Sequence, residues 1–202
     1  MLADAMRHLG LSEGGGKEAV AGDGEGRGTA AGGTVYIMRG LPGSGKSSLT
    51  RSIAAASPSA CVCSADDFFS RGGGKSEAAL RRAGCNTPEK VYRFAFDRAL
   101  LGKAHGQCRD TFDKALARRV ACVIVDNTNS TRQEYEYYAK RAGACGYALR
   151  VIELRCASMA EVQACCARCV HKVPWHVYEM MLGRWEQDQR AVVVASPGHH
   201  LL

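Results

Sequence analysis

The segment Gly40-Leu41-Pro42-Gly43-Ser44-Gly45-Lys46-Ser47 decides the fold of this 202-residue chain. It follows the apolar run 35–38 and precedes residues 47–56, which have the composition of a helix. The segment matches G-x-x-x-x-G-K-[ST] in the strand–loop–helix context that this pattern requires. Its glycines let backbone amides turn inward around a phosphate, and the following helix directs its positive dipole end there. The segment therefore predicts a P-loop that binds a nucleoside triphosphate.

Two side chains of the loop have specific expected tasks. Lys46 is expected to reach the β- and γ-phosphates, and Ser47 to hold Mg²⁺. The predicted cofactors are therefore ATP and Mg²⁺. The residues expected to surround the phosphates are Gly40, Pro42, Gly43, Ser44, Gly45, Lys46, Ser47 and Ser48.

Composition divides the chain into three parts. Residues 1–33 contain 10 of the 23 glycines and few large apolar side chains. Such a segment cannot bury enough surface to offset its ordering entropy. We therefore expect a disordered Gly/Ala-rich tail over 1–33, a P-loop domain over 34–190 and a C-terminal tail over 191–202. Residues 34–202 carry 24 basic and 15 acidic side chains, so nucleotides and nucleic acid are candidate partners, although many soluble enzymes are mildly basic without binding nucleic acid.

The sequence also indicates a compartment. No apolar stretch approaches the roughly 18 residues of a membrane span, and the N-terminus has no apolar signal-peptide core. The ten cysteines show no spacing typical of a disulfide scaffold, and Cys166-x-x-Cys169 has no second ligand pair for zinc. We interpret the cysteines as reduced and buried, and expect an intracellular, cytoplasmic protein with no membrane partner.

Strand-like runs alternate with helical patterns along the rest of the chain. We expect strands over 35–38, 60–64, 120–125 and 147–154, the third apolar throughout, as in a strand buried on both faces. Helices are expected over 47–56, from 88 to about 117 with an interruption near Gly102 or Gly106, over 130–142, and after 158 and 174. Strands separated by helices predict an α/β fold of the P-loop NTPase class, with a three-layer, doubly wound parallel sheet.

Ligands of such sheets bind beyond the carboxyl ends of the strands, and acidic residues lie at two of these ends. Asp66 and Asp67 follow the second strand, and Asp126 follows the third. A carboxylate can take the proton of an attacking hydroxyl, so one of the first two is expected to be a general base, although either could instead cap the next helix. Asp126 is expected near Mg²⁺. Asn129 is either a substrate contact or a helix-cap residue.

Four motifs together resemble the P-loop polynucleotide 5′-hydroxyl kinases of the phage type. They are G-L-P-G-S-G-K-S at 40–47, S-A-D-D-F-F at 64–69, V-D-N-T-N at 125–129 and R-C-V-H-K-V-P at 168–174. They look closer still to the eukaryotic P-loop proteins that share the D-D-F-F and D-N-T-N signatures. The resemblance implies a helical lid beside the P-loop and transfer of the γ-phosphate of ATP to a 5′-hydroxyl.

The resemblance also implies roles for single residues. Asp66 matches the family's general base, and Arg168 matches the lid arginine that reaches the donor phosphates. Lys46 keeps its P-loop task, and Asp126 lies near the phosphates or the acceptor. His171 matches a histidine of the eukaryotic branch. Weaker candidates for substrate contact are Asp67, Arg71, Asn127 and Asn129.

The chain departs from the family pattern on the acceptor side. The position of the family's acceptor arginine is occupied by Phe69, and Arg71 lies two residues farther on. The second lid arginine is replaced by residues of the run 164–166. Residues 70–87 could supply other acceptor contacts or form a solvated loop. We therefore also consider a kinase of a small metabolite and a nucleotide-binding adaptor that hydrolyses ATP slowly or not at all.

Overall fold

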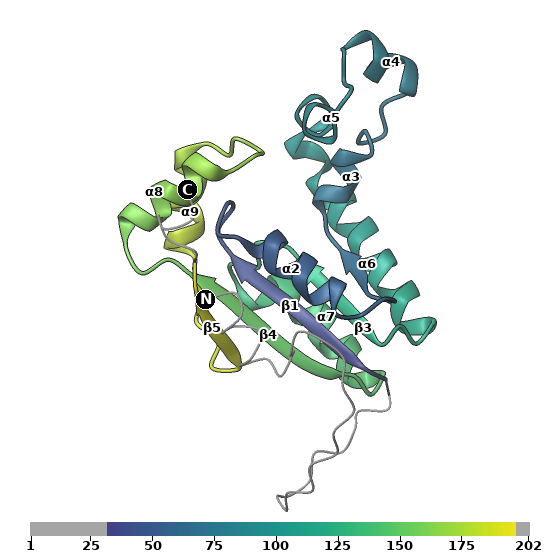
Figure 1. The fold of residues 1–202 in the computed structure, drawn as a ribbon, viewed down its shortest axis with the longest axis vertical. Helices are drawn as coiled ribbons and strands as arrows, with labels where there is room; N and C mark the ends of the chain where they lie inside the picture. The colour runs from purple at the N-terminus through teal and green to yellow at the C-terminus, as the bar shows by residue number, and fades with distance from the viewer. Residues whose placement is uncertain (1–31, 197–202) are drawn as a thin grey trace, which may run out of the picture.

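The computed structural model describes residues 32–196, which form an α/β fold around one parallel sheet (Figure 1). Its strands are β1 (Thr34–Gly40), β2 (Cys61–Cys63), β3 (Cys122–Asp126), β4 (Ala148–Arg155) and β5 (Ala191–Ala195). They lie in the order β2-β3-β1-β4-β5, and every neighbouring pair is parallel. The predicted fold class is confirmed. The P-loop follows the central strand, with the carboxyl ends of β3 and β4 on either side of it.

Each face of the sheet carries its own apolar core because successive strand residues point to opposite faces. On one face, Tyr36 and Met38 pack with Leu49 and Ile53 of α2 (Lys46–Ala55). On the other face, Val35 and Ile37 join side chains of α6 (Leu101–Ala117) and α7 (Arg132–Ala144). The result is a three-layer arrangement with the P-loop at the end of the middle layer.

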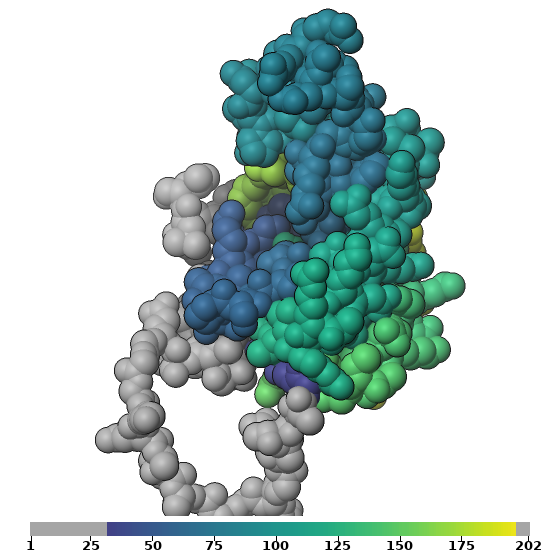
Figure 2. Space-filling model, turned by 90° about the vertical axis from the view of Figure 1, so that its right-hand side faces the viewer, coloured from purple at the N-terminus to yellow at the C-terminus, as the bar shows by residue number. Residues whose placement is uncertain are grey.

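Two helical units stand beyond the carboxyl end of the sheet (Figure 1). The first, which we call the arm, comprises α3 (Asp66–Ser70), α4 (Glu77–Arg82), α5 (Pro88–Ala95) and the 3-10 turn Arg98–Leu100. The second, which we call the lid, comprises α8 (Met159–Arg168) and α9 (Trp175–Gly183). The arm and the lid lie on opposite sides of the P-loop, and Figure 2 shows the surface hollowed between the arm and α2.

Two expectations about the elements are wrong. Helix α6 runs through Gly102 and Gly106, and the interruption falls earlier, where Phe96 is extended and Asp97 caps a new turn. Burial of α6 side chains against the sheet outweighs the glycine cost of about 1 kcal/mol each. The segment 191–195, expected to begin a tail, is strand β5 at the sheet edge. Its three consecutive valines suit a pleated edge strand, paired with β4.

Several predicted starts agree with the structure. Thr87 caps α5 by accepting a hydrogen bond from the amide of Lys90, with Pro88 at the first helical position. Ser158 caps α8 by accepting one from the amide of Glu161. The segment 70–87, left open between loop and acceptor contacts, contains α4, whose residues are all at least partly exposed. The predicted tail over 1–33 falls almost entirely outside the described residues.

Candidate active site

The carbonyl groups of the P-loop are bound by side chains from several parts of the chain. Lys46 Nζ donates to the carbonyls of Gly40 and Leu41, at 2.8 and 2.9 Å. The next three carbonyls are bound by residues from the lid and from the end of β5. The donors are Tyr178 to Pro42 at 3.0 Å, Arg168 to Gly43 at 3.2 Å and Ser196 to Ser44 at 3.1 Å. Five successive carbonyls are therefore fixed by three separate parts of the chain.

This arrangement turns the loop's amides toward the site. In a trans peptide the carbonyl and the following N–H point in opposite directions, so a carbonyl fixed outside leaves an amide facing inside. Within the described residues, the amides of Gly43 and Gly45 have no protein acceptor, and both glycines have positive φ, 74° and 99°. The buried hydroxyl of Ser44 also lacks a partner in this part of the chain. Such a cradle of free donors suits a phosphate.

Gly43 has a second reason to be glycine. A Cβ added there would lie 2.0 Å from the backbone oxygen of Cys165 in α8. The lid helix therefore packs backbone to backbone against the P-loop. The Cys165 sulfur lies 3.5 Å from that of Cys156, and the hydrogen bond that the two thiols share lowers the pKa of Cys165. All ten cysteines of the chain lie within the described residues and are free.

Lys46, Ser47 and Asp126 meet at the base of the cradle. Lys46 and Asp126 are each 9% exposed, and burial lowers the pKa of Lys46 while raising that of Asp126. The charge of Asp126 raises the pKa of Lys46, and the charge of Lys46 lowers the pKa of Asp126, so each residue offsets part of the effect of burial on its neighbour. The hydroxyl of Ser47 also lowers the pKa of Asp126. A carboxylate and a hydroxyl beside a phosphate cradle fit a Mg²⁺ ion that takes its remaining ligands from phosphate and water.

Asp66 and Asp67 begin α3, across the site from the P-loop. The Asp66 side chain is 53% exposed, yet its negative charge raises the pKa of both Lys46 and Asp126. Tyr92 of α5 donates a hydrogen bond to Asp66 Oδ1 at 3.0 Å. Asp67 instead faces Arg71 at 3.9 Å, in a pair whose members are about half exposed and largely exposed. Of the two acids, Asp66 is the one that shares the site with Lys46.

The D-N-T-N motif connects the parts of the site. Asn127 accepts a hydrogen bond from the amide of Ala65 at 3.0 Å, which fixes the residue before Asp66. The carbonyl of Thr128 accepts from the amide of Gly40 at 3.1 Å, where the P-loop begins. Asn129 is 3% exposed, has a φ of 50° and donates to the carbonyl of Met38 at 2.8 Å. In this conformation Asn127 and Asn129 serve as structural ties, of which only Asn127 remains partly exposed.

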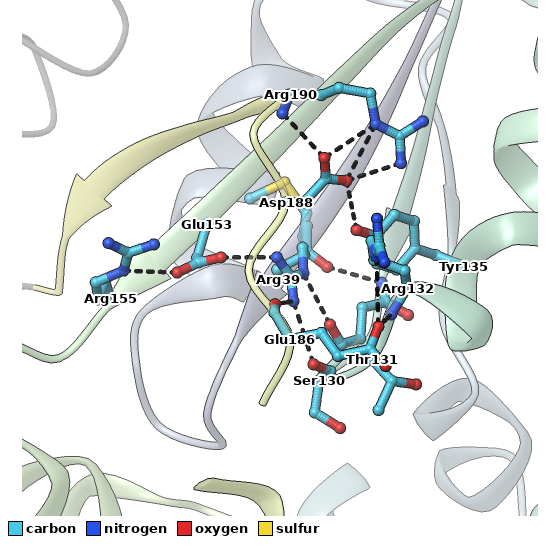
Figure 3. Close-up of polar contacts among 12 residues, drawn as sticks. Arg39, Ser130, Thr131, Arg132, Tyr135, Glu153, Arg155, Glu186, Asp188 and Arg190 are labelled. Atoms are coloured by element: carbon cyan, nitrogen blue, oxygen red, sulfur yellow. Dashed lines mark hydrogen bonds and ion pairs between the residues drawn. The ribbon is translucent and has the colours of Figure 1, made fainter. Parts of the chain in front are cut away.

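Arg39, a buried arginine of β1, lies at the centre of a network of polar contacts beside this motif (Figure 3). Arg39 is fully buried and forms a 2.7 Å ion pair with Glu153 of β4. Its other nitrogens donate to the carbonyls of Asn129, Ser130 and Glu186. The guanidinium also lies about 5 Å from the ring centres of Tyr135 and Trp185. Arg39 thus links the residue before the P-loop to the D-N-T-N loop.

The structure also gives the contacts of the two predicted arginines, whose roles toward a ligand stay predictions. Arg168 extends to the outer face of the P-loop, where it contacts the Gly43 carbonyl and the Cys165 sulfur at 3.4 Å. Arg71 is exposed on the arm and pairs with Asp67. Sequence reasoning missed Arg39, Tyr92, Tyr178 and Ser196. A buried position for Arg39 could have been inferred from its place within an apolar strand, whereas the other three depend on tertiary contacts.

A family model described as an AAA domain matches residues 35–173. The chain belongs to this family, and its P-loop NTPase fold agrees with the match. The chain is 31% identical over 104 residues to NEDD4-binding protein 2 of Homo sapiens. That alignment covers 52% of this chain and 5% of the relative, so the chain spans a small fraction of that protein.

Two kinases are among the solved structures that align with this chain. A sugar kinase from Janibacter sp. aligns at a TM-score of 0.50 with 14% identity, over 81% of this chain and 85% of that one. The APS kinase CysC of Mycobacterium tuberculosis aligns at 0.44 with 16% identity, over 80% and 88%. At 14% identity the likeness to the sugar kinase concerns the fold alone. No helix within residues 32–196 is long and apolar enough to cross a membrane.

Proposed function

We propose that this protein transfers the γ-phosphoryl group of ATP to a hydroxyl group, and that the acceptor is the 5′-hydroxyl of a nucleic acid or nucleotide. One observation carries the proposal. Asp66 is half exposed and accepts a hydrogen bond from Tyr92, and its negative charge raises the pKa of Lys46 and Asp126 beside the phosphate cradle. An open carboxylate beside a P-loop is what an incoming hydroxyl requires for proton removal.

Each group of the site has a task in this mechanism. The inward amides and Lys46 would hold the donor phosphates, and Asp66 would take the acceptor proton as the new O–P bond forms and the bond to the ADP oxygen breaks. Mg²⁺ held by Ser47 and Asp126 would supply positive charge against the developing negative charge. Positioning and electrostatics account for most of the catalysis in such transfers.

The arm supports a nucleic-acid acceptor. It carries seven basic and five acidic residues, and two of its aromatic side chains, Phe94 and Phe96, are 43% and 45% exposed. Lys75 lies 5.3 Å from the ring centre of Phe94. Cations beside exposed rings are typical of surfaces that bind single strands through phosphates and stacked bases. The basic residues of the arm are Arg71, Lys75, Arg81, Arg82, Lys90, Arg93 and Arg98.

A small metabolite is the second candidate acceptor. Phe69, at the position of the family's acceptor arginine, is 1% exposed in the arm core and cannot bind a phosphate. Arg71 is paired with Asp67. Without these two arginine contacts, the site lacks the side chains expected to bind a phosphate group of the acceptor. Binding of a small, uncharged acceptor would then depend little on the salt concentration.

The test is transfer of labelled γ-phosphate to 5′-hydroxyl RNA and DNA oligonucleotides and to a panel of metabolites. We expect label on an oligonucleotide. We also expect Asp66→Asn to lower kcat by about 10²–10⁴-fold, the usual contribution of a placed general base, with an unchanged Kd for ATP. Asp110→Asn, an exposed acid on α6, is the matched control. Label on a metabolite alone would favour the second candidate, and ATP binding without any transfer would favour an adaptor.

A further inference from the structure

A histidine of the lid meets the arm at Asp66. His171 lies in the turn between α8 and α9, and its Nε2 is 3.6 Å from Asp66 Oδ2. Its ring centre is 3.8 Å from that of Tyr92, whose hydroxyl donates to Asp66 Oδ1. Tyr92 of the arm thus donates to one oxygen of the Asp66 carboxylate, and His171 of the lid lies beside the other without a hydrogen bond to it.

The local chain conformation keeps His171 in this place. Lys172 has a φ of 51°, in the left-handed region that residues other than glycine enter at a cost of about 1–2 kcal/mol. Its amide donates to the carbonyl of Cys169, which closes a tight turn at the end of α8. Such strain persists only where the surroundings fix the conformation. The turn directs the His171 side chain, 28% exposed, toward the arm.

The Tyr92 contact makes the two carboxylate oxygens unequal. Burial and the neighbouring Asp66 raise the pKa of the phenol, so Tyr92 remains protonated and acts as a donor. Oδ1 therefore carries a hydrogen bond. Oδ2 lies beyond hydrogen-bond distance of His171 and keeps its lone pairs for an incoming proton. Tyr92 in turn is fixed by packing between His171 and Phe96, with the Phe96 ring centre at 5.7 Å.

We propose that Tyr92 and His171 form a bridge between the arm and the lid that positions Asp66 with Oδ2 as its reactive oxygen. Tyr92 acts as a positioning residue by holding Oδ1. His171 acts as a latch, because its contact with Tyr92 exists only while the lid lies against the arm. Any acceptor must then enter between these units and present its hydroxyl to Oδ2. The proposal rests on the proposed function and extends it to residues of the arm and the lid turn.

Kinetics of Tyr92 and His171 variants test the bridge. Tyr92→Phe keeps the ring and its packing but removes the hydroxyl, and we expect kcat to fall at least tenfold with the Kd for ATP and the acceptor KM within about twofold. In the Asp66→Asn background the same change should have no further effect. His171→Ala should raise the acceptor KM and lower kcat, and His171→Gln should restore part of both.

Tyr137→Phe is a matched control, because Tyr137 also donates to an aspartate, Asp113, between α6 and α7 and away from the site. It should leave kcat unchanged. If Tyr92→Phe and Tyr137→Phe behave alike while wild type transfers phosphate, the bridge proposal is wrong and the proposed function stands.

A second measurement does not depend on activity. Stacking on Tyr92 should shift the imidazole proton resonances of His171, assigned from their loss in His171→Gln. Tyr92→Leu should move them back toward the values of an exposed histidine, whereas Tyr137→Phe should not. Should wild type transfer phosphate to no acceptor, the proposed function fails, and unshifted His171 resonances would then overturn the bridge as well.

Discussion

The P-loop and the segment that carries Asp66 face each other across the site, but they are held very differently. Five successive P-loop carbonyls are bound by Lys46, by both helices of the lid and by the residue after β5. On the other side, Asp66 depends on Tyr92, on the Asn127 bond to Ala65 and on the long contact with His171.

The difference indicates how the two halves work. A phosphate cradle whose carbonyls are already bound by the protein is formed before a phosphate arrives, so binding costs little conformational entropy. The arm packs around a small core that it shares with the start of α6, and its α4 has no buried residue. The donor half is therefore rigid, whereas the acceptor half can adapt to its ligand.

Arg168 provides the largest expected effect. If the lid arginine leaves the Gly43 carbonyl to meet the transferred phosphoryl group, Arg168→Ala should lower kcat by about 10³–10⁵-fold. The exposed Arg141→Ala on α7 should leave kcat unchanged. Single-turnover kinetics measure both. A loss below tenfold would mean that Arg168 only supports the outer face of the P-loop.

A substitution of Glu153 tests the buried ion pair between Arg39 and Glu153. Glu153→Gln would leave the fully buried Arg39 without its charged partner, and the free energy of unfolding should fall by about 3–5 kcal/mol. Urea denaturation followed by circular dichroism gives this value. Glu136→Gln, in an exposed pair with Lys140, should change it by at most about 1 kcal/mol. Equal losses in the two variants would contradict the structural role of Arg39.

Alanine substitutions at one glycine of the P-loop and one glycine of the arm compare how strongly the two regions resist a change. Gly43→Ala combines positive φ with a clash against Cys165, and we expect about 1–2 kcal/mol from the conformation and about 1–3 kcal/mol from overpacking. Gly84→Ala in the arm has a similar φ of 65° but open space around its Cβ. Thermal unfolding and ATP titration should therefore show a larger loss for Gly43→Ala. Identical melting temperatures would argue against a rigid donor half.

Asp188 gives a smaller effect that depends on pH. It is a buried acid whose hydrogen bonds from Arg190 and Tyr135 lower its pKa far below the usual value. A lowered folded-state pKa stabilises the protein above the unfolded pKa of about 3.9, and this contribution disappears as pH falls toward the folded value. Asp188→Asn should cost about 1.5–3 kcal/mol at pH 7 and clearly less at pH 2.5. Urea denaturation at both pH values checks this, and a gap independent of pH would contradict it.

The sequence predicted correctly those structural elements that depend on residues close together in the chain. The P-loop, the strand before it and the helix starts at 88 and after 158 all follow from patterns within a few positions. It was wrong about Gly102 and Gly106 because contacts of α6 with the sheet outweigh the local preference of glycine. It was wrong about 191–195 because this strand depends on pairing with β4, a contact distant in the sequence.

The sequence by itself determined the class of fold and the chemical groups that a phosphate would meet, since both are encoded in contiguous motifs. The tertiary structure alone decided that Arg168 rests outside the P-loop, that Asn129 is a buried tie and that Tyr92 holds Asp66. Tyr92 and Asp66 are 26 positions apart, and Arg168 and Gly43 are 125 apart. Contacts over such separations arise from packing around the whole sheet, which no local pattern specifies.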